Sequence, residues 1–292
     1  MRPRNTRRPA AALALAVLAA FPLRLAAQLE APPRPQGEIG FSLGAVFSFS
    51  AAESLHRQSW TAAPLAGMTA ENTLAAAPAA SLFLGGSYTR FFGRGIGIQA
   101  GFGYAKNGVS ASASFKAGGT ATAFSRHLTA SDDAGEITSV PLYAGLALRW
   151  AGSRSTLVFT AGPALYLHSI LVETEAGILA ALSGGGAGTG AFRAPVSVPD
   201  QTWIAAGLQA GLSADLPINA ATALFFELRY FYSPAKSFAW TWESGTLHGL
   251  DDSSLAVSWD AAAAAAAGAA TRPLEVDPSI FQFSAGLRFR LR

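Results

Sequence analysis

The feature that most constrains the fold of this chain is a two-residue alternation of large apolar and small side chains. In residues 37–50, for example, Ile39, Phe41 and Leu43 alternate with glycine and serine. Successive side chains of a β-strand point to opposite faces, so such a segment predicts a strand with one continuous apolar face. We therefore expect an all-β chain, and the alternation occurs in eight segments: 37–50, 80–92, 95–105, 137–150, 155–168, 202–216, 221–233 and 279–292.

The second face of these segments distinguishes a membrane barrel from a soluble one. It carries mostly glycine, serine and alanine, whereas a soluble barrel presents lysine and glutamate to water. Charged residues make up 13% of the chain, about half of the share in soluble domains. Small side chains suit the narrow interior of an eight-stranded barrel, and the apolar face would then contact lipid. We predict an eight-stranded antiparallel up-and-down transmembrane β-barrel, with a soluble barrel as the alternative.

The connections between the segments alternate in length. Outer-membrane barrels have short periplasmic turns and longer external loops. The pattern therefore predicts both termini in the periplasm, four long extracellular loops and a location in the bacterial outer membrane. The long links are 51–79, 106–136, 169–201 and 234–278, and the short links are 93–94, 151–154 and 217–220.

The N-terminal residues follow the order of a secretory signal peptide. Four arginines precede an uncharged apolar stretch at 10–23, and small residues follow it. This stretch is too short to span a bilayer as a helix. We expect residues 1–27 to be the signal peptide, residues 28–36 to be a short periplasmic segment, and residues 37–292 to form the barrel.

The barrel hypothesis assigns places to two groups of residues. Charged and polar residues on the small-residue face would lie inside, where Glu227 and Arg229 could pair with each other or with Arg288. Aromatic residues near the strand ends would form girdles at the two membrane interfaces, with Trp150 and Phe92 at the periplasmic one. The predicted interior cluster is Glu227, Arg229, Arg288, Arg149 and Gln99, and the predicted girdle is Trp150, Tyr104, Tyr230, Tyr232 and Phe92.

Four short motifs follow a pattern known from one group of proteins: Pro141-Leu142, Ala161-Gly162-Pro163, FFELRYFY at 225–232 and FSAGLRFRL at 283–291. They resemble strands of the small outer-membrane β-barrel families, the OmpA-like and PorT-like barrels. The resemblance implies a barrel that is inserted by the barrel assembly machinery and surrounded by outer-membrane lipid and lipopolysaccharide. The last strand in that family usually ends on an aromatic residue, whereas this chain ends on Arg292.

The sequence contains no residue spacing that is diagnostic of a catalytic site. The chain has no cysteine, which excludes thiolate nucleophiles, thiolate metal sites and disulfides. The histidines are predicted at or beyond the outer rim of the barrel, where a hydrolase could place its site. They are His56, His127, His168 and His248.

The sequence therefore favours a non-catalytic barrel with no cofactor. We predict a monomer that is structural, or that binds at the cell surface through its four long loops. The net charge of +3 gives no reason to expect nucleic-acid binding. Two alternatives remain, a rim hydrolase acting on lipid A or peptides and a narrow pore for small solutes. Because Glu227 and Arg229 would face the interior, they could form part of an ion path or only the packing of the core.

Overall fold

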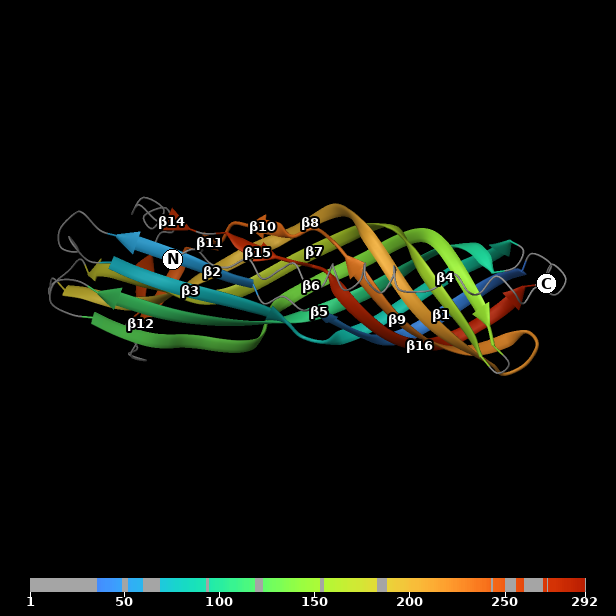
Figure 1. Cartoon of the computed structure of the whole chain (residues 1–292). Coiled ribbons are helices and arrows are strands. Elements are labelled where there is room, and N and C mark those ends of the chain that lie inside the picture. Colours follow the sequence, from blue (N-terminus) through green and yellow to red (C-terminus); the bar gives the residue numbers. More distant parts are fainter. Residues whose placement is uncertain are drawn as a thin grey trace.

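The computed structural model describes residues 36–48, 52–59, 69–92, 95–118, 123–152, 155–182, 188–242, 244–249, 256–259, 270–271 and 273–291. The predicted signal peptide, and all of the following segment except its last residue, lie outside this set. Every element among the described residues is a β-strand, and no helix there is long and apolar enough to cross a membrane. Figure 1 shows an elongated molecule, with a ring of strands on the right and a β-structured extension on the left.

Among the described residues, eight strands close into a ring. Each of them is antiparallel to both of its neighbours, and the last strand pairs with the first. The order around the ring follows the order in the chain, so the predicted up-and-down barrel is confirmed. The ring strands are β1 (Gln36–Ser48), β4 (Ser81–Phe92), β5 (Ile96–Gly118), β6 (Ala123–Ala151), β7 (Thr156–Leu182), β8 (Gly188–Pro217), β9 (Thr222–Tyr232) and β16 (Ile280–Leu291).

The outer wall of the ring is an apolar belt. Large aliphatic and aromatic side chains point outward on every strand, and a soluble barrel would bury them instead. Eight of them, one from each strand, are each at least 42% exposed: Leu43, Leu84, Ile98, Leu146, Leu165, Leu208, Leu228 and Leu287.

The inner wall carries small residues because aromatic rings occupy the space above them. A side chain at Gly101 would meet the ring of Tyr143, and one at Gly103 would meet the ring of Phe83. An eight-stranded barrel is just wide enough for side chains to fill its interior. The glycine-rich second face is therefore a packing requirement of this narrow ring.

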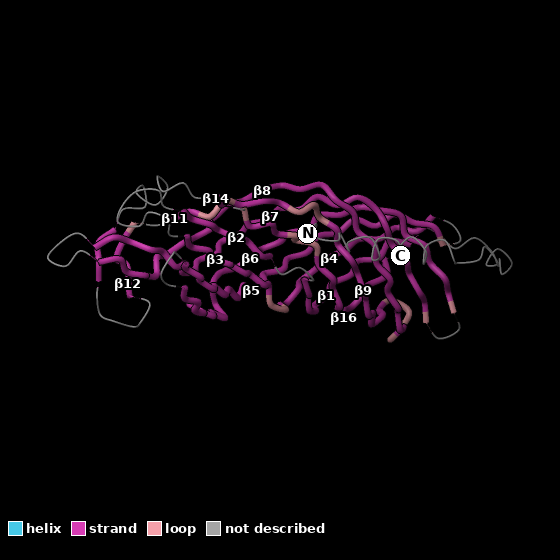
Figure 2. The backbone as a smooth tube through the Cα atoms, turned by 60° about the vertical axis from the view of Figure 1, so that its left-hand side comes forward, coloured by secondary structure: helices cyan, strands magenta, loops and turns pink. Residues whose placement is uncertain are grey.

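The first three long links of the sequence are largely strand rather than loop, and this corrects our prediction. β5 continues to Gly118 and β6 begins at Ala123, so most of 106–136 is a hairpin. In the same way β7 and β8 continue through most of 169–201. The first long link contains β2 (Ala52–Ser59) and β3 (Thr69–Pro78). We call the strands beyond the apolar belt the extension, and Figure 2 shows strand running continuously from the ring into it.

Where the extension begins, the apolar side chains of the strands switch from the outer face to the inner face. On β5 the inward residues change from Gly103 to the buried Val109 and Ala113, while the outward residues change from Tyr104 to Lys106. A strand outside the bilayer has water on its outer face, so its apolar residues must turn inward. The outward apolar rows end at this boundary, and strands predicted from those rows alone therefore end here too.

The extension encloses a hydrophobic core of its own. Two short strands from the last long link, β10 (Lys236–Phe238) and β15 (Leu274–Val276), pair as a separate sheet. They insert Phe238 and Leu274 into this core, and Trp203 packs edge-on against Phe238 with ring centroids 5.0 Å apart. The extension core comprises Leu74, Ala76, Val109, Ala113, Ile137, Ile170, Val172, Val196, Val198, Trp203, Phe238, Trp240, Leu274 and Val276.

Four further short strands complete the sheet of the extension. Two of them pair with β8, one pairs with β12, and one pairs with β2. In that order they are β11 (Thr241–Trp242) and β12 (Gly245–Gly249), β13 (Ala256–Trp259), and β14 (Ala270–Thr271).

The apolar belt gives a direct test of the membrane assignment. Phe226 lies near the middle of β9 and faces outward. We expect Phe226→Arg to lower the free energy of unfolding by about 2–4 kcal/mol, because a cation at the bilayer midplane is costly. Urea unfolding in lipid vesicles measures the effect. Ser114→Arg, outward on the extension, is the matched control and should change stability by at most about 0.5 kcal/mol. Equal costs at the two positions would contradict the belt.

Candidate functional site

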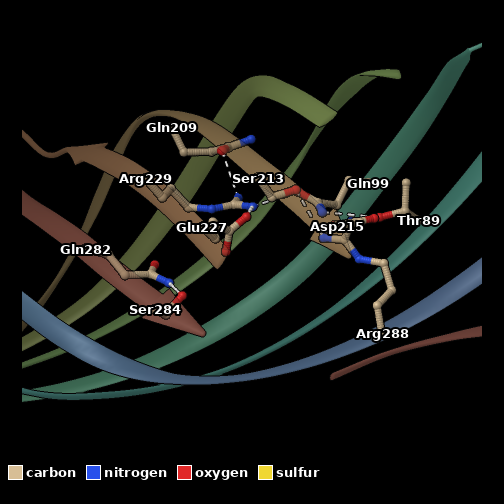
Figure 3. A network of polar contacts seen from close by, with 10 residues as sticks. All are labelled: Thr89, Gln99, Gln209, Ser213, Asp215, Glu227, Arg229, Gln282, Ser284 and Arg288. Carbon is tan, nitrogen blue, oxygen red and sulfur yellow. Dashed lines mark hydrogen bonds and ion pairs between the residues drawn. The ribbon is translucent and has the colours of Figure 1, made fainter. Parts of the chain in front are cut away.

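Arg229 stands at the centre of a polar network that fills the barrel interior (Figure 3). Its side chain is 1% exposed. Nη2 donates to Glu227 Oε1 at 2.6 Å and to Gln99 Oε1 at 2.9 Å. Nη1 donates to Gln209 Oε1 at 2.8 Å. Gln99 in turn donates to Thr89 Oγ1 at 3.1 Å, so one guanidinium links four strands of the ring.

Aromatic rings cover the same guanidinium. The Arg229 Cζ atom lies 4.3 Å from the ring centroid of Tyr143 and 5.8 Å from that of Phe231. A cation over an aromatic face is attracted by the electron density of the ring, most strongly where water is excluded. Charge, hydrogen bonds and packing therefore hold Arg229 in a single position.

A second ion pair lies closer to the short turns. Arg288 Nη1 lies 2.6 Å from both carboxylate oxygens of Asp215, and Arg288 Nη2 donates to Ser213 at 3.3 Å. We had expected Arg288 to be a possible partner of Glu227. The register explains the difference, because Glu227 lies opposite Ser284 on β16, four residues away from Arg288 along the strand.

A third group closes the barrel at the short-turn end. The buried Glu38 pairs with Arg149, whose Nη2 lies 2.5 Å from Oε1, and Arg290 Nε lies 3.6 Å from the same oxygen. Arg149 also lies over the ring of Phe91 at 3.4 Å. Glu38 was not among the predicted interior residues. Its position in the alternation of β1, on the same face as Gly40, is the signal that would have found it.

The interior charges are therefore paired while the outer wall is apolar. This combination is the reverse of a soluble barrel. The chain is a transmembrane β-barrel of the outer-membrane type. The structure places all five predicted interior residues inside this barrel, but in three separate groups rather than one cluster: Gln99, Glu227 and Arg229 in the first, Arg288 in the second, and Arg149 in the third.

The aromatic residues proposed for the girdles lie toward the two ends of the barrel wall. Phe92 ends β4, and the half-buried Trp150 lies one residue before the end of β6, both at the short turns. Tyr230 and Tyr232 face outward at the other end of β9, where the extension begins. Tyr104 lies at the same boundary on β5 and is also exposed.

His168 does not lie at the rim, where the sequence predicts it as the last residue of the segment 155–168. It belongs to β7 and points inward, 1% exposed. Its Nδ1 lies 2.8 Å from Ser139 Oγ and its Nε2 lies 3.0 Å from Ser233 Oγ. The imidazole stacks on Tyr166. Both ring nitrogens thus contact hydroxyl groups, and the site is sealed from solvent.

The remaining histidines give no further candidate in the part of the chain that the structure describes. His56, His127 and His248 belong to β2, β6 and β12, and their side chains lie outside the described set. No group of three or more histidine, aspartate and glutamate side chains in the described part could hold a metal ion.

Comparison with known proteins finds similarity to solved structures alone, since no protein-family model and no curated protein matches the barrel. The outer membrane protein OprG from Pseudomonas aeruginosa aligns with a TM-score of 0.44 and 11% identity, covering 88% of this chain and 96% of that chain. The outer membrane protease OmpT from Escherichia coli aligns with a TM-score of 0.37 and 9% identity, covering 90% and 99%. Neisserial surface protein A aligns with a TM-score of 0.33 and 12% identity, covering 85% and 96%.

Proposed function

We propose that this barrel is a non-catalytic outer-membrane protein that presents a rigid β-structured platform for binding at the cell surface. The proposal rests on one observation: at the membrane boundary, the apolar side chains switch from the outer to the inner face of the strands. Beyond the apolar belt, β5 to β8 continue as strands around the extension core. A surface that is already ordered loses little conformational entropy when a partner binds. The extension is therefore better suited to binding than four flexible loops would be.

The filled interior argues against the pore alternative. Arg229, Arg288 and Glu38 each hold an oppositely charged partner inside the ring, at successive levels along the barrel. The aromatic rings of Phe83, Tyr143 and Phe231 pack against one another in the same space. A ring of eight strands has an interior that side chains can fill.

The setting of His168 argues against a hydrolase site at this histidine. A Ser-His-Asp site needs an accessible serine and a carboxylate that orients the imidazole. His168 is buried, and both of its nitrogens lie against serine hydroxyls. A lipid or peptide substrate has no direct path to these groups.

The proposed orientation follows from the short turns. The ends of β1 and β16 pair with each other at the short-turn end of the barrel, opposite the extension. Since periplasmic turns of such barrels are short, we propose periplasmic termini and an extracellular extension. The partners proposed with this orientation are surrounding lipid and lipopolysaccharide, and the barrel assembly machinery during insertion. The platform is proposed to act as a monomer.

Single cysteines test this orientation, because the natural chain has none. Lys116 is exposed on the extension and Ala220 is exposed in the turn before β9. In intact cells, a membrane-impermeant maleimide should label Lys116→Cys and leave Ala220→Cys unlabelled until the outer membrane is permeabilised. The opposite labelling pattern would place the extension in the periplasm and overturn the platform proposal.

The purified protein tests the two alternatives directly. In planar bilayers it should give no unitary currents, and with lipid A or unstructured peptides it should give no hydrolysis. Stable single-channel currents would favour the pore, and product formation that survives repurification would favour the hydrolase.

A further inference from the structure

A groove lies on the outer wall of the barrel, where the apolar belt meets the extension. Leu82 and Leu84 of β4 and Tyr104 of β5 form its apolar side, and all three are exposed. Lys106 and Glu136, on the neighbouring strands β5 and β6, form its polar side. Their side chains make an ion pair with Nζ and Oε2 2.5 Å apart. The groove thus combines an apolar wall with one cation and one anion at the level of the membrane interface.

Two glycines form the floor of this groove. Among the described residues, nothing lies within 4 Å of the place where a Cβ of Gly108 would be. Gly108 pairs with Glu136, and next to that pair lies Gly135, which has a φ of +154°. A side chain at Gly135 would collide with the backbone of Leu171. The backbone is therefore bare between the apolar wall and the ion pair, and this space can receive a ligand.

The chemistry of the groove favours an amphiphile whose headgroup carries both signs of charge. An ammonium group such as that of Lys106 binds phosphate, and a carboxylate such as that of Glu136 binds a primary ammonium. A headgroup with negative charge only would place its phosphate beside Glu136 and be repelled. Acyl chains would lie along Leu82, Leu84 and Tyr104, as lipid does along the rest of the belt.

We propose that this groove is a binding site for a phospholipid with a phosphoethanolamine headgroup. The phosphate lies at Lys106 and the ammonium lies at Glu136. The site requires the barrel to stand in lipid, but it does not depend on the surface-binding role proposed above. The leaflet in which the lipid lies follows from the orientation of the barrel.

Lipid competition measured by native mass spectrometry tests the site. The full-length mature barrel is equilibrated with equal amounts of phosphatidylethanolamine and phosphatidylglycerol of the same acyl composition, and with lipid A in a separate arm. We expect phosphatidylethanolamine to be retained about tenfold over phosphatidylglycerol, which corresponds to about 1.4 kcal/mol. Glu136→Gln keeps the shape of the side chain and should reverse this preference. Glu173→Gln, an exposed acid outside the groove, is the matched control and should leave it unchanged.

A second variant tests the groove without changing any charge. Gly108→Leu places a side chain into the open space and should remove the retained lipid, while urea unfolding remains at the wild-type midpoint. Equal retention of the two phospholipids by the wild type would overturn the proposal. Retention unchanged by Gly108→Leu, or displacement of phosphatidylethanolamine by lipid A, would also overturn it. None of these outcomes depends on the maleimide labelling of the extension.

Discussion

Replacing Glu227 by alanine should lower the free energy of unfolding in lipid vesicles by about 3–5 kcal/mol, the usual cost of removing one partner of a buried ion pair. Arg229 would keep its hydrogen bonds to Gln209 and Gln99, but both acceptors are neutral amides. A guanidinium that is 1% exposed would then lie inside the barrel without an anion beside it. Urea unfolding followed by tryptophan fluorescence measures the loss.

The register of the strands predicts which second substitution restores stability. Arg229→Met removes the unpaired cation and fills much of the same volume, so Glu227→Ala combined with Arg229→Met should be more stable than Glu227→Ala alone. Arg288→Met should give no such rescue, because Arg288 is held by Asp215. The loss of unfolding free energy caused by Arg288→Met should instead add to the loss caused by Glu227→Ala. Rescue by Arg288→Met but not by Arg229→Met would show that the interior pairing differs from the one described.

Replacing Phe238 by alanine should open the extension and leave the barrel folded. Phe238 is buried between the strands of the extension and packs against Trp203. Loss of a buried phenylalanine costs about 3–5 kcal/mol, because a cavity remains. We expect the cost to fall on the extension alone, since its core is separate from the polar network inside the ring. Trypsin should then cleave at Lys116 in vesicles in which the wild type resists.

The matched control for this experiment is the same substitution on the lipid-facing wall. Phe283 on β16 faces outward in the apolar belt and makes no part of the extension core. Phe283→Ala should weaken the barrel in urea while the extension keeps its resistance to trypsin. If Phe238→Ala instead unfolds barrel and extension together, the two cores form one cooperative unit, and the platform is not an independent structure.

The membrane part of this fold could be predicted from sequence because its physical constraint is simple. Lipid requires an unbroken outward apolar row on each strand, and all eight rows were found. The extension obeys the same alternation with the faces exchanged, as Val109 and Ala113 turn inward beside Gly108 and Ser112. A search for one outward row ends at such an exchange. A segment in which the apolar residues switch from one face to the other is better interpreted as one continuous strand.

For the interior residues, alternation predicts the face of each side chain but not the partner that it contacts. Alternation assigns Gln99, Glu227 and Arg229 to the inner face, because each lies on the face opposite the outward apolar row of its strand. It does not determine the partners across the ring, which depend on the stagger of neighbouring strands; Asp215 therefore meets Arg288. His168 is the last residue of the predicted segment 155–168, which places it at the rim, and only the continuation of β7 to Leu182 makes it part of the buried interior.

The exchange of faces on β5 also determines how this barrel is matched to the thickness of its bilayer. The backbone runs without a break from Tyr104 past Lys106, so only the side chains mark where the hydrocarbon ends. Moving the boundary between outward apolar and outward polar side chains by two residues displaces it by about 7 Å along the strand. Hydrophobic mismatch costs fractions of a kcal/mol per ångström, so a few outward substitutions at this level would fit the same barrel to a thicker or thinner membrane. The immersion depth of the protein can therefore evolve without any change in its turns, its register or its interior.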